Sequence, residues 1–294
     1  MYRAMKSLLV LAVVAVVGCA NEPSKLSGAA SSGSPAIKTP AAAPSGSVED
    51  RLARVEKRLD KVVDILEQAM PPAEPDPDGT YAVPVDPVDP VQGPADAKIT
   101  IVEGFEFLCP YCYVVNPTVD QILQKYPKDV RLVSKYLVIH GPPAIAPGVA
   151  ACAAAKQGKF KEMKAALWGH LFKMEGDRPS VQPEEAREEN LEKLAGEAGV
   201  DVAKMKSDLQ TCQTWLTSSK STLGPFGVNG TPAFFINGRY INGAQPFEEF
   251  DKVIQEELAK ADKVIADGSV KPADYYEKQV VGKGLKKVKG RFED

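Results

Sequence analysis

Two cysteines separated by two residues, Cys109 and Cys112, are the part of this chain best suited to chemistry. The apolar, β-rich run 98–105 before them predicts a buried strand, and residues 113–126 after them predict a helix. A thiol at the start of a helix faces unpaired backbone N–H groups and the positive end of the helix dipole, which favour the thiolate. Its pKa can then fall from about 8.5 into roughly the 3.5–7.5 range. The spacing therefore predicts a redox-active dithiol.

The N-terminus indicates where such chemistry would take place. Arg3 and Lys6 precede an apolar run, Leu8 to Val17, that is too short to span a bilayer and fits a signal peptide in residues 1–18. Cys19 then completes a sequence that resembles a bacterial lipobox, in which the cysteine is acylated. The alternative is an ordinary signal peptide, or an anchor helix with an incidental cysteine. Acylation would hold the protein on the periplasmic side of a bacterial membrane, where disulfides persist.

Composition narrows the classes of function. The chain of 294 residues has a formal net charge of −3, which argues against a nucleic-acid partner. If Cys19 is acylated, four of the five cysteines remain, an even number as expected of disulfide-forming cysteines. The length suits one sizeable domain with accessory segments, and no cofactor is expected.

The chain divides into five parts after the signal peptide. Residues 19–47 are rich in Ala, Ser, Gly and Pro and predict a flexible tether. Residues 48–70 predict a helix, and the proline-rich residues 71–94 predict an extended, fairly stiff linker. Residues 95–266 carry the predicted strands and helices of one globular domain. Residues 267–294 predict a weakly structured tail with one possible helix at about 274–283 and a basic end.

The helix at 48–70 has a regular apolar pattern. Apolar residues recur alternately four and three positions apart, at Val48, Leu52, Val55, Leu59, Val62, Leu66 and Ala69. About three heptads of this kind predict a coiled coil, and a lone helix of this length is marginal in water. The alternative is an amphipathic helix packed on its own domain, which the proline-rich flanks disfavour. We therefore predict a homo-oligomer through this helix, a dimer or a trimer; residues 51–56 resemble a short motif of trimeric coiled coils.

Downstream of the dithiol, the sequence predicts strands and helices in a definite order. Residues 130–138 alternate as a strand does, and about 144–219 predict a helical block. Residues 228–241 predict a loop and a β-hairpin with an Asn-Gly turn, and 247–266 predict a closing helix. The order is strand, helix, strand, helical block, hairpin and helix, which indicates an α/β fold.

Two motifs more than a hundred residues apart make this order of strands and helices resemble one particular family. They are Cys-Pro-Tyr-Cys at 109–112 and Gly-Val-Asn-Gly-Thr-Pro-Ala-Phe-Phe-Ile-Asn-Gly at 227–238. Together they resemble the DsbA-like thioredoxin-fold family of thiol:disulfide oxidoreductases, over roughly residues 80–266. The resemblance implies a thioredoxin fold with a helical insertion at about 144–219, here preceded by the short coiled-coil helix.

A zinc site is the alternative use of a Cys-x-x-Cys pair. It would need two more ligands at suitable spacing. The remaining candidates are not arranged as such a pair: Cys152, Cys212, His140 and His170. No metal site is therefore expected.

The resemblance also implies roles for individual residues. Cys109 matches the nucleophile that forms a mixed disulfide with the substrate, and Cys112 matches the resolving cysteine. Thr231 and Pro232 match the cis-proline loop of the family, whose backbone groups can pair with an extended substrate. Without the resemblance, a trans proline that starts a strand would be the expectation for Pro232.

The residues around the two cysteines tune the chemistry. Pro110 lacks an N–H group and suits the first helical turn, and Tyr111 replaces the histidine of the strongly oxidising pattern, which leaves the strength of oxidation open. Glu103 matches the buried acid behind the active site of family members, where a carboxylate of raised pKa can relay the proton of Cys112. Glu106 is the competing acid and is expected nearer the surface; either acid could instead be solvated.

Two further cysteines, Cys152 and Cys212, fall in the predicted helical block. Because two unpaired thiols are uncommon outside the cytoplasm, we predict a structural disulfide between them. It would close a loop of about sixty residues and stabilise the fold by about 4 kcal/mol on the chain-entropy account. The alternative is a pair of buried free thiols that pack as small apolar side chains.

Three functions fit these motifs. The first is a dithiol oxidase that donates the Cys109–Cys112 disulfide to exported cysteine-containing proteins and is reset by a membrane redox partner. The second is an oligomeric disulfide isomerase or reductase, favoured by Thr231 before Pro232 and by a stalk that would direct several active sites to one substrate. The third is a lipid-anchored coiled-coil protein that only binds clients, which the intact cysteine pair disfavours. The oxidase is the leading hypothesis.

Overall fold

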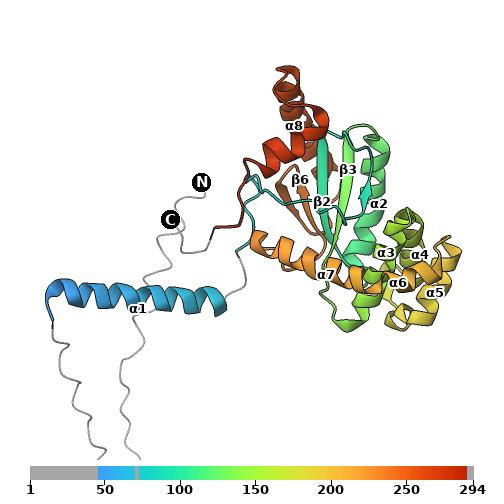
Figure 1. Cartoon of the computed structure of the whole chain (residues 1–294), viewed down its shortest axis with the longest axis horizontal. Coiled ribbons are helices and arrows are strands. Elements are labelled where there is room, and N and C mark those ends of the chain that lie inside the picture. Colours follow the sequence, from blue (N-terminus) through green and yellow to red (C-terminus); the bar gives the residue numbers. More distant parts are fainter. Residues whose placement is uncertain (1–45, 70–72, 290–294) are drawn as a thin grey trace, which may run out of the picture. The chain divides into compact units, whose positions relative to one another are not determined.

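The computed structural model describes residues 46–69 and 73–289. The predicted signal peptide, Cys19 and all but the last two residues of the tether lie outside these ranges. The helix α1 and the folded domain are described separately (Figure 1). Within the described ranges, none of the helices combines the length and the apolar character that a bilayer crossing requires.

Helix α1 covers Val48–Ala69 and begins with a reciprocal cap. The Asp50 N–H donates to Ser47 Oγ at 3.1 Å, and the Ser47 N–H donates to the Asp50 carboxylate at 3.0 Å. This arrangement pairs two backbone donors at the start of the helix. The six large apolar residues of the predicted seam are exposed, by between 43% for Leu66 and 74% for Val48. Taken by itself, α1 thus carries a continuous apolar stripe, which is unfavourable in water.

A five-stranded sheet forms the centre of the domain, in the order β1-β3-β2-β6-β7. Its strands are β1 (Val91–Gln92), β2 (Ile99–Phe105), β3 (Val130–Tyr136), β6 (Ala233–Ile236) and β7 (Arg239–Asn242). β2 runs parallel to β3, and the other neighbours are antiparallel. Every residue of β2 is buried, as expected of a central strand with both faces covered.

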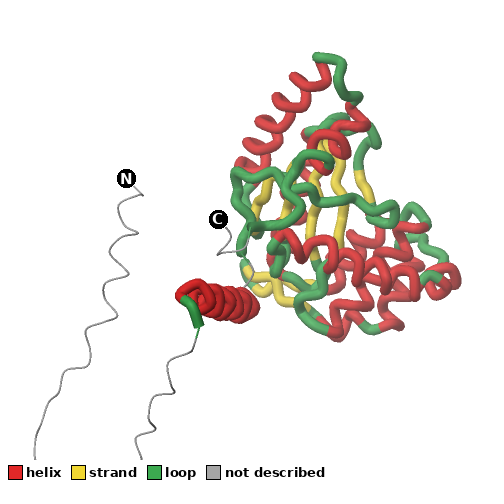
Figure 2. The backbone as a smooth tube through the Cα atoms, turned by 60° about the vertical axis from the view of Figure 1, so that its left-hand side comes forward, coloured by secondary structure: helices red, strands yellow, loops and turns green. Residues whose placement is uncertain are grey.

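Helices α2 (Pro110–Lys125) and α8 (Phe247–Ala266) cover one face of the sheet. Their apolar residues join those of β2, β3 and β6 in one cluster, which includes Val115, Val119, Ile122, Phe250 and Ile254. On the other face, Leu223 and Phe226 pack with apolar residues from both ends of the domain. Figures 1 and 2 show the strands side by side at the centre and the short helices gathered at one end.

The helical insertion lies between β3 and β6. It contains α3 (Ile145–Lys156), α4 (Phe160–Leu171), α5 (Glu188–Glu197), α6 (Val202–Ser207), α7 (Leu209–Leu223) and three 3-10 turns (Pro142–Ala144, Pro183–Ala186 and Gly224–Phe226). Helix α3 lies close to β3, because Gly148 has no side chain: a Cβ there would meet the Tyr136 ring at 2.4 Å.

A small hairpin inside the insertion was not predicted. It pairs β4 (Phe172–Glu175) with β5 (Arg178–Val181). The turn between them uses Gly176 at a φ of 64°, a conformation that favours glycine. The sequence analysis predicted a helical block over these residues, because the two strands are too short to show a clear alternating pattern.

The structure corrects the prediction that residues 71–94 form an extended linker outside the domain. Tyr81, Ala82 and Val83 are buried, and the Tyr81 N–H donates to the Gly238 carbonyl at 2.8 Å in the β6–β7 turn. Prolines remove backbone donors, but they do not prevent the residues between them from burying apolar surface. For that reason, proline content alone was a poor guide to this segment.

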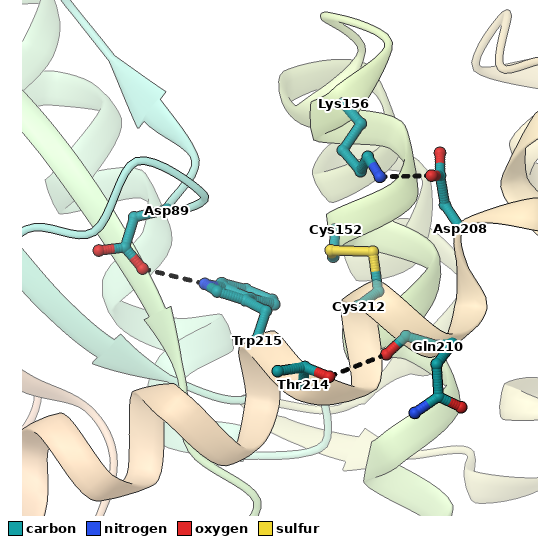
Figure 3. Close-up of a disulfide and its surroundings, with 8 residues drawn as sticks. All are labelled: Asp89, Cys152, Lys156, Asp208, Gln210, Cys212, Thr214 and Trp215. Carbon is teal, nitrogen blue, oxygen red and sulfur yellow. Dashed lines mark hydrogen bonds and ion pairs between the residues drawn. A yellow bond between two sulfur atoms is a disulfide. The ribbon is translucent and has the colours of Figure 1, made fainter.

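A buried ion pair connects the next part of the same segment, residues 86–89, to strand β3. Lys135 of β3 is fully buried, with its Nζ 2.6 Å from the Asp89 carboxylate and 3.1 Å from that of Asp86. Trp215 of α7 donates its Nε1–H to the other Asp89 oxygen at 3.0 Å (Figure 3). Residues 84–90 are therefore part of the domain.

The segment 267–289 is also more ordered than the predicted weak tail. It contains a 3-10 turn (Pro272–Asp274) and a π-helical turn (Tyr276–Val281). Tyr276 is buried and donates its hydroxyl to the Val83 carbonyl at 2.6 Å. The Leu285 N–H donates to the Thr80 carbonyl, and the Ala82 N–H donates to the Leu285 carbonyl, both at 2.8 Å. The two ends of the domain thus pair with each other, a long-range contact that no local sequence pattern predicts.

Candidate active site

Cys109 occupies the N-cap position of α2, and Pro110 is the first residue of that helix. The backbone of Cys109 is extended (φ −83°, ψ 116°), and no side chain caps the helix. The N–H groups of the first turn therefore remain available to the sulfur of Cys109. Cys109 and Cys112 are both free thiols and both buried.

The two thiols have opposite shifts in pKa. A hydrogen bond from the Cys112 thiol is the largest cause that lowers the pKa of Cys109, to about 6, and the backbone N–H groups of Cys112 and Tyr111 act in the same direction against burial. Burial is the largest cause that raises the pKa of Cys112, followed by its hydrogen bond to Cys109. At neutral pH, these shifts favour the thiolate at Cys109 and the protonated thiol at Cys112.

Thr231 and Pro232 lie directly beside the Cys109 sulfur. The peptide bond between Thr231 and Pro232 is cis, and in its protonated form the Cys109 thiol donates to the Thr231 carbonyl at 3.2 Å. The Thr231 hydroxyl is buried with no hydrogen-bond partner in the described part of the chain. It also lowers the pKa of Cys109, because it can donate to the sulfur once the thiol has ionised.

Glu103 lies on β2, six residues before Cys109, and is almost completely buried. Burial raises the pKa of Glu103, and the Lys164 ammonium of α4, 3.8 Å away, acts in the opposite direction. Asp120 of α2 raises the Glu103 pKa further by repulsion. The Glu103 charge in turn contributes to the raised pKa of Cys112, so the carboxylate acts on the resolving thiol.

The sequence analysis did not single out Lys164, although the residue pattern of helix α4 contained a signal for it. The buried face of α4 consists of Phe160, Met163, Lys164, Leu167, Trp168 and Leu171, which is a helical repeat of large side chains with one charge in it. A lysine on the apolar face of a helix needs a buried partner of opposite charge. Only the structure shows that this partner is Glu103.

Glu106, the competing acid, has a different setting from the expected one. It is fully buried rather than near the surface. Its Oε1 accepts the backbone N–H groups of Ile139 and His140, each at 3.0 Å, and its Oε2 contacts His140 Nδ1. The carboxylate therefore holds the loop after β3 against the turn that leads to Cys109.

Tyr111 is the exposed residue between the two cysteines. It is 67% exposed, and Val114, one turn further along α2, is 52% exposed. Both side chains therefore lie on the surface of the first turns of α2.

Cys152 of α3 and Cys212 of α7 form a disulfide (Figure 3). The Cα atoms are 5.6 Å apart, and the bridge spans 60 residues. It joins the first and last long helices of the insertion. Within residues 46–69 and 73–289, no three His, Cys, Asp or Glu side chains gather in a way that could hold a metal ion.

The sequence of the domain matches a known family. A profile of the family described as thioredoxin matches residues 86–256. Among curated proteins, the chain is 32% identical over 184 residues to the Na(+)/H(+) antiporter NhaA 3 of Salinispora tropica and 32% identical over 168 residues to the antiporter NhaA of Herminiimonas arsenicoxydans. The matches cover 61% and 55% of this chain but 26% and 24% of the antiporters. The chain thus spans about a quarter of the length of these relatives.

Solved structures share the fold over most of their own length. A thioredoxin-like oxidoreductase from Silicibacter pomeroyi is 28% identical, with a TM-score of 0.50, over 60% of this chain and 94% of that one. Proteus mirabilis ScsC in a compact conformation is 21% identical, with a TM-score of 0.52, over 73% and 96%. Bacillus subtilis BdbD is 22% identical, with a TM-score of 0.52, over 62% and 99%. The last two show similarity of fold alone.

Proposed function

This chain belongs to the thioredoxin family, and we propose that it is a protein thiol:disulfide oxidoreductase that oxidises dithiols of exported proteins through Cys109 and Cys112. The observation that carries the proposal is the pairing of a thiol of lowered pKa with one of raised pKa at the start of α2. An ionised, stabilised sulfur is a good leaving group, which is what a disulfide donor requires at this position.

The proposed reaction starts from the Cys109–Cys112 disulfide. A substrate thiolate attacks the Cys109 sulfur, so that a mixed disulfide forms and Cys112 leaves as a thiolate and takes up a proton. A second substrate thiolate then attacks the substrate sulfur of the mixed disulfide, and Cys109 leaves as a thiolate. The substrate loses two electrons to the cysteine pair. A membrane redox partner would remove these electrons again.

The proposed location is the outer side of a bacterial cytoplasmic membrane or the periplasmic side of the outer membrane, with the lipid carried by Cys19. The support is the signal-peptide and lipobox pattern in the sequence. The Cys152–Cys212 disulfide agrees with an oxidising compartment. The tether at 19–47 would then give the domain reach from the membrane.

Disulfide isomerase or reductase activity is the second candidate, and one feature favours it. The apolar stripe of α1 is exposed in a single copy, as expected of a helix that associates with other copies. An oligomer of dithiols could break and re-form bonds in one misfolded client. A non-catalytic client-binding protein is the weaker alternative, because it gives no reason for the tuned thiols.

One experiment separates these candidates. The reduction potential of the Cys109–Cys112 pair is measured against glutathione, and refolding of scrambled ribonuclease is then assayed with and without residues 48–70. A strongly oxidising potential without isomerase activity supports the oxidase. Isomerase activity that disappears with the helix supports the second candidate. If Cys109→Ala still exchanges disulfides at the rate of the unaltered protein, the proposed function is wrong.

A further inference from the structure

Four lysines lie close together near the end of the described chain. They fall within residues 283–289, which contain no acidic residue: Lys283, Lys286, Lys287 and Lys289. All four are exposed, whereas the whole chain has a formal net charge of −3. We call residues 283–289 the basic segment. It concentrates positive charge on a chain that is acidic overall.

The backbone of the basic segment is fixed to the domain. The Leu285 N–H donates to the Thr80 carbonyl at 2.8 Å, and the Ala82 N–H donates to the Leu285 carbonyl at the same distance. The Val288 N–H donates to the Pro225 carbonyl at 2.9 Å. The lysines therefore extend from a backbone that is already ordered, so a partner would not have to order it on binding.

Neutral groups of the protein hold two of the four ammonium groups. Lys283 Nζ donates to the side-chain oxygen of Gln279, and Lys286 Nζ donates to a backbone carbonyl. Neither acceptor carries a charge. Asp274, upstream of the segment, forms its ion pair with Lys278 at 3.0 Å. The positive charges of Lys283 and Lys286 are thus left to act on a partner outside the chain.

The basic segment is attached at the end of the central sheet opposite to the dithiol. Residues 80–82, which pair with Leu285, also form a hydrogen bond to the β6–β7 turn. That turn lies beside the first residues of β2, since the Asn237 N–H donates to the Thr100 carbonyl at 2.9 Å. Cys109 follows the other end of β2. A strand of seven residues separates these ends by roughly 20 Å.

We propose that the basic segment is a docking surface for the phosphate-bearing head groups of an anionic lipid bilayer, and that it holds the domain on the membrane with the dithiol directed away from the lipid. A cluster of four lysines has the size that recognises such a surface. Leu285, which is 46% exposed between the lysines, adds an apolar side chain that can enter the head-group region.

A bilayer is the anionic partner that best fits the rest of the chain. The proposed lipid on Cys19 would keep the domain near a membrane through the tether at 19–47. The head groups would then be present at high effective concentration, so that even a weak contact is populated. This inference rests on the proposed extracytoplasmic, lipid-anchored location and involves no step of the redox reaction.

Vesicle binding tests the proposal on the mature chain, residues 19–294, with Cys19→Ser so that no attached lipid contributes. The chain is mixed with vesicles of phosphatidylcholine alone, or of equal parts of phosphatidylcholine and phosphatidylglycerol, and the bound fraction is measured by flotation. We expect binding to the anionic vesicles only. Binding should be lost between about 0.1 M and 1 M salt, as the Debye length falls from about 10 Å to about 3 Å.

Two variants of equal net charge then locate the contact. The first replaces the lysines of the basic segment: Lys283→Gln, Lys286→Gln, Lys287→Gln and Lys289→Gln. Each lysine near an anionic surface contributes roughly fivefold to binding, so this variant should bind more than about a hundredfold more weakly. The matched control replaces four exposed lysines of the insertion and should bind as the unaltered chain does: Lys161→Gln, Lys173→Gln, Lys193→Gln and Lys204→Gln.

Alkylation of Cys109 tests the orientation. In the reduced protein, a bulky maleimide should modify Cys109 at the same rate with and without anionic vesicles, because the sulfur lies at the other end of the sheet. Protection of Cys109 by the vesicles would show that the proposed orientation is wrong.

Three results would overturn the docking surface while the proposed oxidoreductase function stands. They are equal binding to both kinds of vesicle, equal binding of the unaltered chain and the first variant, and equal losses in the two variants. A chain that binds polyglutamate but not anionic vesicles would assign the basic segment to an acidic protein instead. Thiol–disulfide exchange is assayed separately, and its absence in the unaltered chain would contradict the proposed function without changing the vesicle result.

Discussion

Cys109 owes its reactivity to groups that the protein brings around one sulfur atom. The Cys112 thiol, the Thr231 hydroxyl and two backbone N–H groups all favour its ionised form. None of these is a fixed positive charge, so the lowered pKa comes from hydrogen bonds at the start of a helix. The effect should therefore depend on the intact arrangement and should respond to single substitutions.

The pH dependence of the reduced protein tests this arrangement. Ultraviolet absorbance of the thiolate should appear with a midpoint at about pH 6, and Cys109→Ser should abolish it. Cys112→Ala should move the midpoint toward the ordinary value of about 8.5, because it removes the largest favourable hydrogen bond. A midpoint that stays near pH 6 in Cys112→Ala would contradict the assignment.

The same shift affects the stability of the reduced protein. Because the folded pKa of Cys109 lies below its unfolded value, ionisation stabilises the folded state. This contribution is complete above the ordinary thiol pKa of about 8.5 and is lost as pH falls through about 6. Urea unfolding of the reduced protein should show a contribution of this sign, which should be absent in Cys109→Ser.

Glu106 should prove structural rather than catalytic. Its Oε1 accepts the N–H groups of Ile139 and His140, so Glu106→Ala leaves both donors without a partner. We expect urea unfolding to show a loss of about 1–3 kcal/mol, with the Cys109 titration unchanged. Glu106→Gln keeps one acceptor oxygen and should lose less. A variant of full stability that exchanges thiols slowly would assign Glu106 to the chemistry instead.

At the residue scale, the sequence predicted the features that depend on neighbouring residues in the chain. The place of Cys109 at the start of a helix followed from the apolar run before it and the helical pattern after it. The approach of Thr231 to its sulfur is a contact over 122 residues and was available only through the family resemblance. Lys164 carried a signal in its own helix, but its partner could not be inferred without the packing of α4 on β2.

At the scale of elements, the disulfide between α3 and α7 should be the main covalent constraint on the insertion. Replacement of Cys152 and Cys212 by Ala frees a loop of 60 residues and should lower the free energy of unfolding by about 4 kcal/mol on the chain-entropy account. Thermal and urea unfolding of the oxidised protein measure this loss. The Cys109 titration serves as the control and should not change, because the bridge lies outside the dithiol site.

The thiol count of the native protein gives an independent check. Mass spectrometry after mild alkylation of the oxidised chain should find Cys152 and Cys212 unlabelled. If both label without denaturant, the bridge is absent from the native protein and the stability prediction lapses with it.

The segments on either side of the sheet show why sequence analysis misjudged the limits of the domain. Lys135 holds Asp86 and Asp89, which precede it by 49 and 46 positions. Trp215 holds Asp89 from 126 positions further along the chain. Such contacts leave no periodic trace in a proline-rich stretch. The central strands were predictable because their apolar runs are long and local, whereas β4 and β5 have only four residues each.

At the scale of the whole molecule, α1 is the element whose partner is still unidentified. Its apolar stripe follows a heptad pattern, and its residues are exposed in a single copy. Water disfavours this arrangement, and an isolated helix of this length is marginally stable. A second or third copy of the same helix would bury the stripe, since each seam residue would enter a space between residues of its partner.

Light scattering during size-exclusion chromatography tests this association. The full chain should elute as a dimer or a trimer, and Leu52→Asp with Leu59→Asp should make it monomeric. Loss of one packed leucine costs about 2–5 kcal/mol, so two buried charges should weaken association by more than roughly a thousandfold. Lys57→Asp, on the opposite side of the heptad, is the matched control and should stay oligomeric.

The activity of the monomeric variant then shows what the stalk contributes. Each domain keeps its own dithiol, so oxidation of a small dithiol peptide should continue at an unchanged rate. Any refolding of scrambled ribonuclease should fall, because one client would no longer meet several cysteine pairs at high effective concentration. A monomeric unaltered chain, or a monomeric variant that refolds ribonuclease as well as the oligomer, would separate α1 from the redox function.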